Sequence, residues 1–332
     1  MQSAILAECV TFTVNISMDI LDLEERKDKK LRNHGAVAQQ PELVQILVTI
    51  GLVFGLMLLV QSVTEQLISG YYHLSTNIIL EDVNGFMAEF GHDLNVFRLA
   101  QMINTVVVFG GAALLMSYLL TGKNFGFFKF NVSVQWMSLV LVPFMMVSIL
   151  PIAMTMQYFV SFIPFPEKWL EMQDTMEALQ KGMLGDPSLS VFAVNLIMIA
   201  VLPAIFEELL FRGILQPLFV KVTGIPTLGI MVTGFVFGLI HMQVINLLPI
   251  AILGVLLGLI YYWTQNIWFP IAAHFIFNGM QAVGYFMATR SEQFDRMESI
   301  ELLPVSYTLG AIAIFAATTY FFYSSNRTLA DG

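Results

Sequence analysis

The stretch VFAVNLIMIAVLPAIFEELLFRGILQPLF, residues 191–219, is long and apolar enough for a membrane-spanning helix, yet it carries two acids and an arginine. These are Glu207, Glu208 and Arg212. A charge near the bilayer centre costs roughly 2.5–3.5 kcal/mol on insertion scales, so charges kept there indicate a use. The stretch predicts an all-α membrane protein with polar chemistry inside the bilayer.

The rest of the chain has the composition of a polytopic membrane protein. Of its 332 residues, 57% are hydrophobic and 12% are charged, and the mean hydropathy is +0.75. Apolar runs that approach the length needed to cross the hydrocarbon lie at residues 43–63, 99–120, 134–156, 190–211, 227–241, 247–263, 267–288 and 303–323. We expect an all-α bundle of about eight transmembrane helices around a polar intramembrane cavity.

The apolar runs divide the chain into four parts. Residues 1–40 lack the features of a secretory signal and are interpreted as a polar cytoplasmic leader. Residues 41–189 hold N-terminal transmembrane helices and loops, 190–289 hold the transmembrane core with the buried charges, and 290–332 hold the last transmembrane helix and a tail. Near residues 167–184 an amphipathic helix on the membrane surface is predicted from the helical spacing of Trp169, Met172, Met176, Leu179 and Met183.

Lysine and arginine in the short connections predict the orientation, because positive loops stay on the cytoplasmic side. They gather in the leader, at Lys123 and Lys129, and at Arg212 and Lys221. The opposite connections, around residues 65–93 and 167–186, are rich in acids. Eight spans then place both termini in the cytoplasm, and we expect a multi-pass protein of a bacterial cytoplasmic membrane.

Two kinds of function are excluded by composition. The single cysteine, Cys9, lies in the leader, so the core has no disulfide, cysteine-based metal site or thiol nucleophile. The net charge is −9, and no basic tract interleaved with aromatic residues suggests a nucleic-acid partner.

In the motif EExxxR, the two carboxylates point in different directions from the helix axis. Glu208 and Arg212 are four residues apart on a helix, so they share a face and should pair. Glu207 is rotated by about 100° from Glu208 and cannot face the same partner, which leaves it free to point into a central cavity. The alternative is a buried ion pair that only locks helices together.

Two further motifs place histidines on neighbouring spans. Phe237 lies one turn before His241, and His274 lies one turn before Asn278. The span that ends at His241 also has a stripe of small residues that would let another helix approach closely, namely Gly229, Thr233, Gly234 and Gly238. A lone membrane histidine is commonly an interhelical hydrogen-bond partner. Two of them, with an asparagine and an unpaired glutamate on adjacent segments, favour chemistry.

This set of side chains suits hydrolysis. A glutamate in a low-dielectric site is a stronger base than in water, and a nearby histidine can share the proton, so together they can activate water. A second histidine and an asparagine can donate hydrogen bonds to a developing oxyanion. This would hydrolyse a peptide bond without a covalent intermediate. One glutamate and two histidines could equally hold zinc with an open water position, although no HExxH motif is present.

The motifs EExxxR, FxxxH and HxxxN, in this order on consecutive membrane segments, resemble the CaaX-protease and bacteriocin-processing (CPBP, Abi) family of intramembrane endopeptidases. The resemblance covers about residues 190–288. It implies that Glu207 and His241 activate the water and that His274 and Asn278 form the oxyanion site. It further implies that Glu208 and Arg212 support Glu207. A glutamate protease of this kind needs no metal cofactor, and its partner is a peptide or membrane-protein substrate, lipidated in some relatives.

Two alternatives to a protease stay open from the sequence. A non-enzymatic protein, such as a bacteriocin-immunity factor, could bind a peptide in the same cavity. A transporter could use Glu207 as a proton relay, but the chain shows no paired half-sequences that suggest inverted repeats.

The depth of the site residues is a test of this interpretation. Alternating spans place Glu207 near the cytoplasmic end of its helix and His241 at the far end of the next. We therefore expect the fourth helix to continue past Phe211, to about Gln216, and the fifth to begin after Thr227, so that Glu207 lies deeper in the membrane.

Overall fold

The computed structural model describes residues 35–122, 128–130, 135–291 and 302–330. Most of the predicted leader, with Cys9 and its basic residues, lies outside these ranges, as does Lys123. The described elements are all helices, which confirms the predicted fold class.

The described helices differ widely in length. In chain order the first are α2 (Glu42–Tyr72), α3 (Thr76–Glu81), α4 (Val83–Phe90), α5 (Asn95–Asn104), η1 (Thr105–Gly111), α6 (Ala112–Thr121), α7 (Trp136–Val160) and α8 (Glu167–Leu184). The rest are α9 (Leu189–Leu196), η3 (Ile197–Val201), α10 (Leu202–Leu210), η4 (Phe211–Leu215), α11 (Gln216–Thr223), α12 (Pro226–Leu239), α13 (Leu247–Thr264), α14 (Trp268–Ala288) and α15 (Val305–Ala330). The three segments labelled η are π-helical turns.

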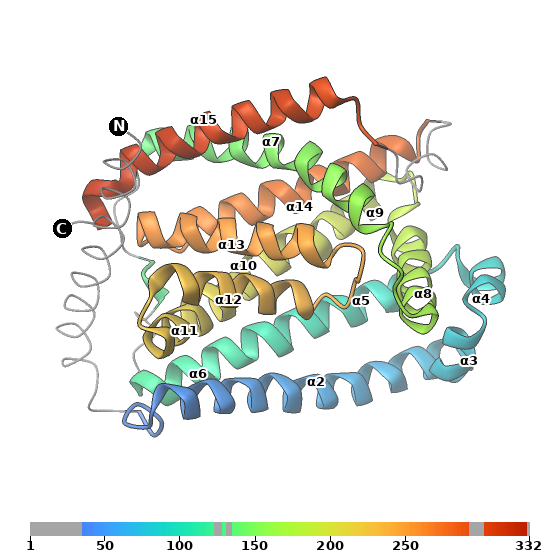
Figure 1. Ribbon diagram of the computed structural model, residues 1–332. Coiled ribbons are helices and arrows are strands. Elements are labelled where there is room, and N and C mark those ends of the chain that lie inside the picture. The colour runs from blue at the N-terminus through green and yellow to red at the C-terminus, as the bar shows by residue number, and fades with distance from the viewer. Residues whose placement is uncertain (1–34, 123–127, 131–134, 292–301, 331–332) are drawn as a thin grey trace.

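The long helices lie side by side with a common direction, as in a membrane bundle (Figure 1). Within the described residues, six helical stretches are long and apolar enough to cross a membrane: 42–72, 95–121, 136–160, 189–223, 247–264 and 305–326. The other two predicted spans also form helices. However, α12 has 14 residues, and α14 is made less apolar by His274, Asn278 and Gln281.

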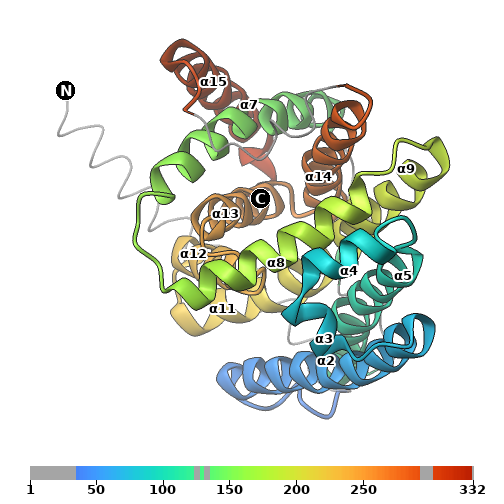
Figure 2. The ribbon, with the colours of Figure 1, turned by 90° about the vertical axis from the view of Figure 1, so that its right-hand side faces the viewer.

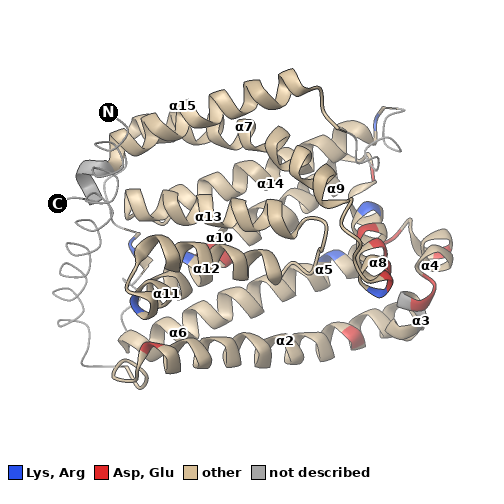
Figure 3. Ribbon diagram, viewed as in Figure 1, with Lys and Arg blue, Asp and Glu red and all other residues tan. Residues whose placement is uncertain are grey.

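Charged residues gather at one end of the bundle, with a small group in its middle on α10 (Figure 3). The charged end carries α8, which lies across the ends of the long helices (Figure 2). Its bounds match the predicted amphipathic helix. Gln173 and Leu179 are its buried side chains near the middle, whereas Trp169, Met172 and Met176 of the predicted apolar face are exposed.

Glycines bring α12 and α13 into close contact, as the small-residue stripe predicts. A Cβ atom at Gly234 would lie 2.6 Å from the backbone nitrogen of Val255, and one at Gly238 would lie 2.9 Å from the carbonyl of Leu247. Such distances are too short for any side chain, so α13 can pack here only against glycine. This contact fixes the helix that ends just before His241.

The segments α9 to α11 form one helical stretch of 35 residues, Leu189–Thr223. It starts at Ser188, whose side chain caps α9 and whose hydrogen bonds hold the pKa of Asp186 below its usual range. Two π-helical turns interrupt it, and each is followed by a proline, Pro203 or Pro217, at the start of the next α-helical segment. A proline inside a helix removes one backbone hydrogen bond and crowds the carbonyl four residues earlier, which explains both interruptions.

The end of this long stretch confirms one expectation and corrects two others. The helix continues past Gln216 to Thr223, so Glu207 lies well inside it, as expected. The expected late start of the next helix is wrong, because α12 begins at Pro226, whose fixed φ suits a first helical position. Arg212 is also not a loop charge: it is fully buried inside the helix, where Glu208 pairs with it.

Candidate active site

Glu208 is the centre of a buried polar cluster. Its Oε1 atom accepts a hydrogen bond from Nη1 of Arg212 at 3.0 Å and lies 2.9 Å from Nδ1 of His274. Glu208 and Arg212 are fully buried, and His274 is 2% exposed. The predicted pair of Glu208 and Arg212 is therefore present. Its contact with His274, which lies on α14, was not foreseen from the sequence.

Arg212 also holds α13 in place. Its Nη2 atom donates to the carbonyl of Gly254 at 2.7 Å, and its guanidinium lies 5.0 Å from the ring centre of Phe237. One turn later, Nε2 of Gln216 donates to the carbonyl of Gly258 at 3.0 Å. Two polar side chains four residues apart thus bind two glycine carbonyls four residues apart. The matching spacings are the sequence signal that could have shown this contact.

His241 stands at the end of α12, and its ring is held by that helix. Its Nδ1 atom lies 2.7 Å from the carbonyl oxygen of Phe237, one turn earlier. A carbonyl only accepts, so Nδ1 carries the proton and Nε2 of the neutral ring has a free lone pair. The half-buried ring is 4.8 Å from the ring of Phe237, which is 5.8 Å from His274. Phe237 therefore packs against both histidines.

Glu207 lies close to both histidines but pairs with neither. It is 7% exposed, and its Oε2 atom is buried without a hydrogen-bond partner in the protein. Its carboxylate lies within electrostatic range of His241 and His274. Glu208 and Glu207 therefore have different surroundings, as the helical rotation between them predicts.

Asn278 binds the long helix that carries Glu207, at a residue that comes earlier in the chain than Glu207. Its Nδ2 atom donates to the carbonyl of Ile199, in η3, at 2.8 Å. One turn earlier on α14, His274 contacts Glu208. The two contacts of α14 thus bracket Glu207, and the bond to Ile199 leaves the second N–H of the carboxamide for another acceptor.

A zinc site is the alternative that the sequence leaves open. Within the described residues, no three side chains of His, Cys, Asp or Glu are placed to hold one metal ion.

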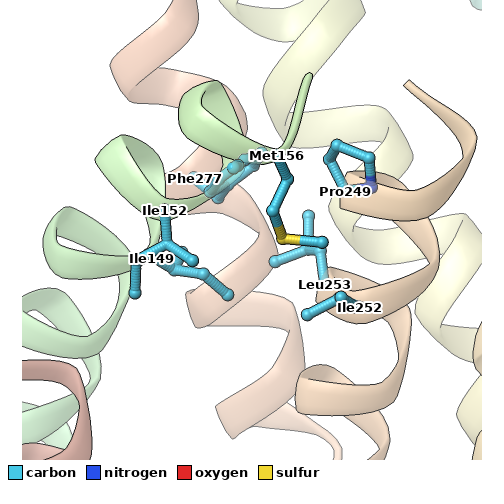
Figure 4. Close-up of a pocket in the computed structure, with 8 residues that line it drawn as sticks. Ile149, Ile152, Met156, Pro249, Ile252, Leu253 and Phe277 are labelled. Atoms are coloured by element: carbon cyan, nitrogen blue, oxygen red, sulfur yellow. The ribbon is translucent and has the colours of Figure 1, made fainter. Parts of the chain in front are cut away.

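An apolar cavity lies between α7, α13 and α14 (Figure 4). Its lining consists of Ile149, Ile152, Ala153, Met156, Pro249, Ile252, Leu253 and Phe277. The polar side chains of the site are instead packed among α10, α12, α13 and α14.

Comparison with known proteins identifies the part of the chain that holds these residues. Residues 189–280 match a family described as type II CAAX prenyl endopeptidase Rce1-like. The Bacillus subtilis (strain 168) protein YpbD, described as uncharacterized, is 28% identical over 113 residues. This match covers 32% of the chain and 55% of YpbD, so the chain spans about half of that relative's length. No solved structure matches the chain.

The matched segment contains the seven site residues predicted from the sequence, and its helices belong to a bundle with six stretches able to cross a membrane. Within this integral membrane protein, residues 189–280 therefore match the Rce1-like family, which agrees with the resemblance drawn from the sequence motifs.

Proposed function

We propose that this protein is a membrane-embedded endopeptidase that hydrolyses a peptide bond with water activated by Glu207 and His241. The observation that carries the proposal is the buried Oε2 atom of Glu207, which has no protein partner and lies in a carboxylate that interacts with both histidines. A buried polar atom without a protein partner is where a water molecule is expected to bind. The match to a family of prenyl endopeptidases supports this chemistry.

In the proposed reaction, the oxygen of water forms a bond to the peptide carbonyl carbon, and a proton of the water moves to Glu207. His241 accepts a hydrogen bond from the same water at Nε2, because its Nδ1 proton is held by Phe237. The carbon–nitrogen bond then breaks, and the proton passes from Glu207 to the leaving amine. The products are a carboxylic acid, which keeps the second hydrogen of the water, and a free amine, and no covalent bond to the enzyme forms.

His274 and Asn278 are proposed to stabilise the oxyanion formed on the carbonyl oxygen. A protonated His274 donates from both ring nitrogens, from Nδ1 to Glu208 and from Nε2 to the oxyanion. Its positive charge would balance the carboxylate of Glu207, since Glu208 and Arg212 already balance each other. Asn278 would use the N–H that is not bound to Ile199.

The proposed substrate is a peptide or membrane protein, and the family description points to prenylated C-termini as the first chemistry to examine. The proposed setting is a bacterial cytoplasmic membrane, with both termini in the cytoplasm. The proposed reaction uses no metal cofactor.

Purified protein in liposomes tests the proposal with two internally quenched peptides, one ending in a farnesylated CaaX sequence and one with the same sequence unprenylated. Glu207→Gln and His241→Ala should each lower kcat by about 10²–10⁴-fold. Glu65→Gln is the matched control, because Glu65 is an exposed acid on α2 and should leave kcat unchanged. Full activity in both site variants would overturn the proposal. Binding of a peptide without cleavage by the wild type would favour a non-enzymatic peptide-binding protein.

A further inference from the structure

We propose that Pro203 is a positioning residue for Asn278, because it leaves the carbonyl of Ile199 without its helical donor and so provides the acceptor that orients the carboxamide. The inference rests on the proposed function, in which Asn278 donates to the oxyanion. Pro203 touches neither water nor substrate in this scheme and acts only through Asn278.

The first step of the argument is local. In an α-helix the carbonyl of Ile199 would accept from the backbone N–H of residue 203. Proline has no N–H, and its ring crowds that carbonyl. The chain responds by widening into the π-helical turn Ile197–Val201, and α10 then starts with Pro203 in its first turn.

The second step concerns the carbonyl that has lost its donor. A backbone carbonyl among apolar helices is costly when it has no hydrogen bond. Nδ2 of Asn278 donates to the carbonyl of Ile199 at 2.8 Å. Because a carbonyl only accepts, this contact also determines which end of the carboxamide carries nitrogen.

The third step connects this bond to the site. Pro203 and Glu207 are four residues apart in α10, so they share one side of that helix. The acceptor that orients Asn278 belongs to the turn directly before this segment. With one N–H bound to Ile199, Asn278 keeps one N–H for the substrate, in an orientation fixed before the substrate binds.

A double-mutant cycle on the full-length protein in liposomes, with the farnesylated peptide as probe, tests the inference. Asn278→Ala should lower kcat by about 10²-fold. Pro203→Ala, which restores the N–H, should lower kcat by about tenfold with little change in KM, as expected when a group that acts in the transition state is misplaced. The double variant should be no slower than Asn278→Ala alone. Pro143→Ala is the matched control, since Pro143 lies inside α7, which contributes no site residue.

Multiplied losses in the double variant, or full activity in Pro203→Ala, would overturn the inference. Folding does not obscure the result, because alanine suits a helix better than proline does. Thermal unfolding of the same four proteins provides a readout without activity: Asn278→Ala should lower Tm in the wild type and much less in Pro203→Ala. Equal Tm shifts in the two backgrounds would also overturn the inference. If the wild type cleaves neither peptide, the proposed function fails, while the Tm cycle still decides whether Pro203 controls the Asn278 bond.

Discussion

Nδ1 of His274 lies 2.9 Å from Oε1 of Glu208, although the two residues are 66 positions apart in the chain. The same carboxylate oxygen accepts from Arg212 at 3.0 Å, so one atom joins the histidine of α14 to the arginine of the glutamate's own helix. A carboxylate that binds one nitrogen of a histidine fixes the direction of the other nitrogen. Glu208 is therefore well placed to orient His274, and Glu207 keeps its carboxylate for other partners.

Replacing Glu208 with glutamine should destabilise the protein strongly, because it leaves the charge of Arg212 buried without its counter-ion. Removing one partner of a buried ion pair costs about 3–5 kcal/mol. The double variant Glu208→Gln/Arg212→Met should recover part of that loss, since no buried charge remains unpaired. Unfolding in detergent measures both. A double variant less stable than Glu208→Gln would contradict the pairing as the source of the effect.

Alanine at Gly234 should separate α12 from α13. Its Cβ atom would lie 2.6 Å from the backbone nitrogen of Val255, which cannot move aside as a flexible side chain can. We expect a loss of about 1–3 kcal/mol from overpacking, together with reduced peptidase activity because α12 carries His241 at its end. Thermal unfolding and the liposome assay measure these effects.

Gly55→Ala is the matched control, because a Cβ atom at this exposed position of α2 would meet nothing within 4 Å. It should leave stability and activity unchanged. A Gly234→Ala protein as stable and as active as Gly55→Ala would show that the close contact of α12 and α13 is not required.

Gln173 should hold the loop that follows His241. Its Oε1 atom accepts from the backbone N–H of Ile245 at 3.2 Å, and Gln173 is a buried residue of α8, 3% exposed. Because Cys9 is the single cysteine, a Cys9→Ser protein with Met242→Cys reports on this loop through its rate of maleimide labelling. We expect Gln173→Ala to speed labelling several-fold, because the loss of one hydrogen bond costs about 1 kcal/mol.

Asp174→Asn serves as the control for α8, because Asp174 is the exposed neighbour of Gln173 on the same helix. It should leave the labelling rate unchanged. Equal labelling rates in the Gln173 and Asp174 variants would mean that the loop is held by other contacts.

The proposed peptidase activity should survive metal chelation. No three metal-binding side chains meet within the described parts of the chain, and Glu207, His241, His274 and Asn278 account for each proposed proton and hydrogen-bond role. Activity after treatment with 1,10-phenanthroline should equal that of the untreated protein, and elemental analysis should find far less than one zinc per chain. Activity that is lost on chelation and restored by stoichiometric zinc would establish a zinc enzyme instead.

Hydropathy predicted which parts of the chain form helices but not the residues at which these helices end. Each predicted apolar run became a helix, and the amphipathic helix has the predicted bounds. However, α2 continues to Tyr72, and the helix that carries Glu207 continues to Thr223. The reason is physical: apolar content measures how far a helix stays in lipid, whereas backbone hydrogen bonding continues past that point until a turn residue stops it.

The sequence also predicted the members of the candidate site but only some of their contacts. The pair of Glu208 and Arg212 follows from helical spacing alone. The contacts of His274 with Glu208 and of Asn278 with Ile199 depend on how α14 packs against the long helix, which no local pattern encodes. Pro203 and Pro217 were the visible signals of the π-helical turns, and they could have indicated that a carbonyl near Ile199 needs a donor.

The two π-helical turns have one more consequence. A π-helical turn is an α-helix with one residue inserted, and each residue turns an α-helix by about 100°. The nine residues of α10 are thus rotated out of phase with α9 before them and with α11 after them. The helical stretch Leu189–Thr223 can therefore present a different face in each of its segments α9, α10 and α11. Its ends can present apolar residues to lipid while its middle turns both glutamates toward the other helices, which a uniform helix could not do.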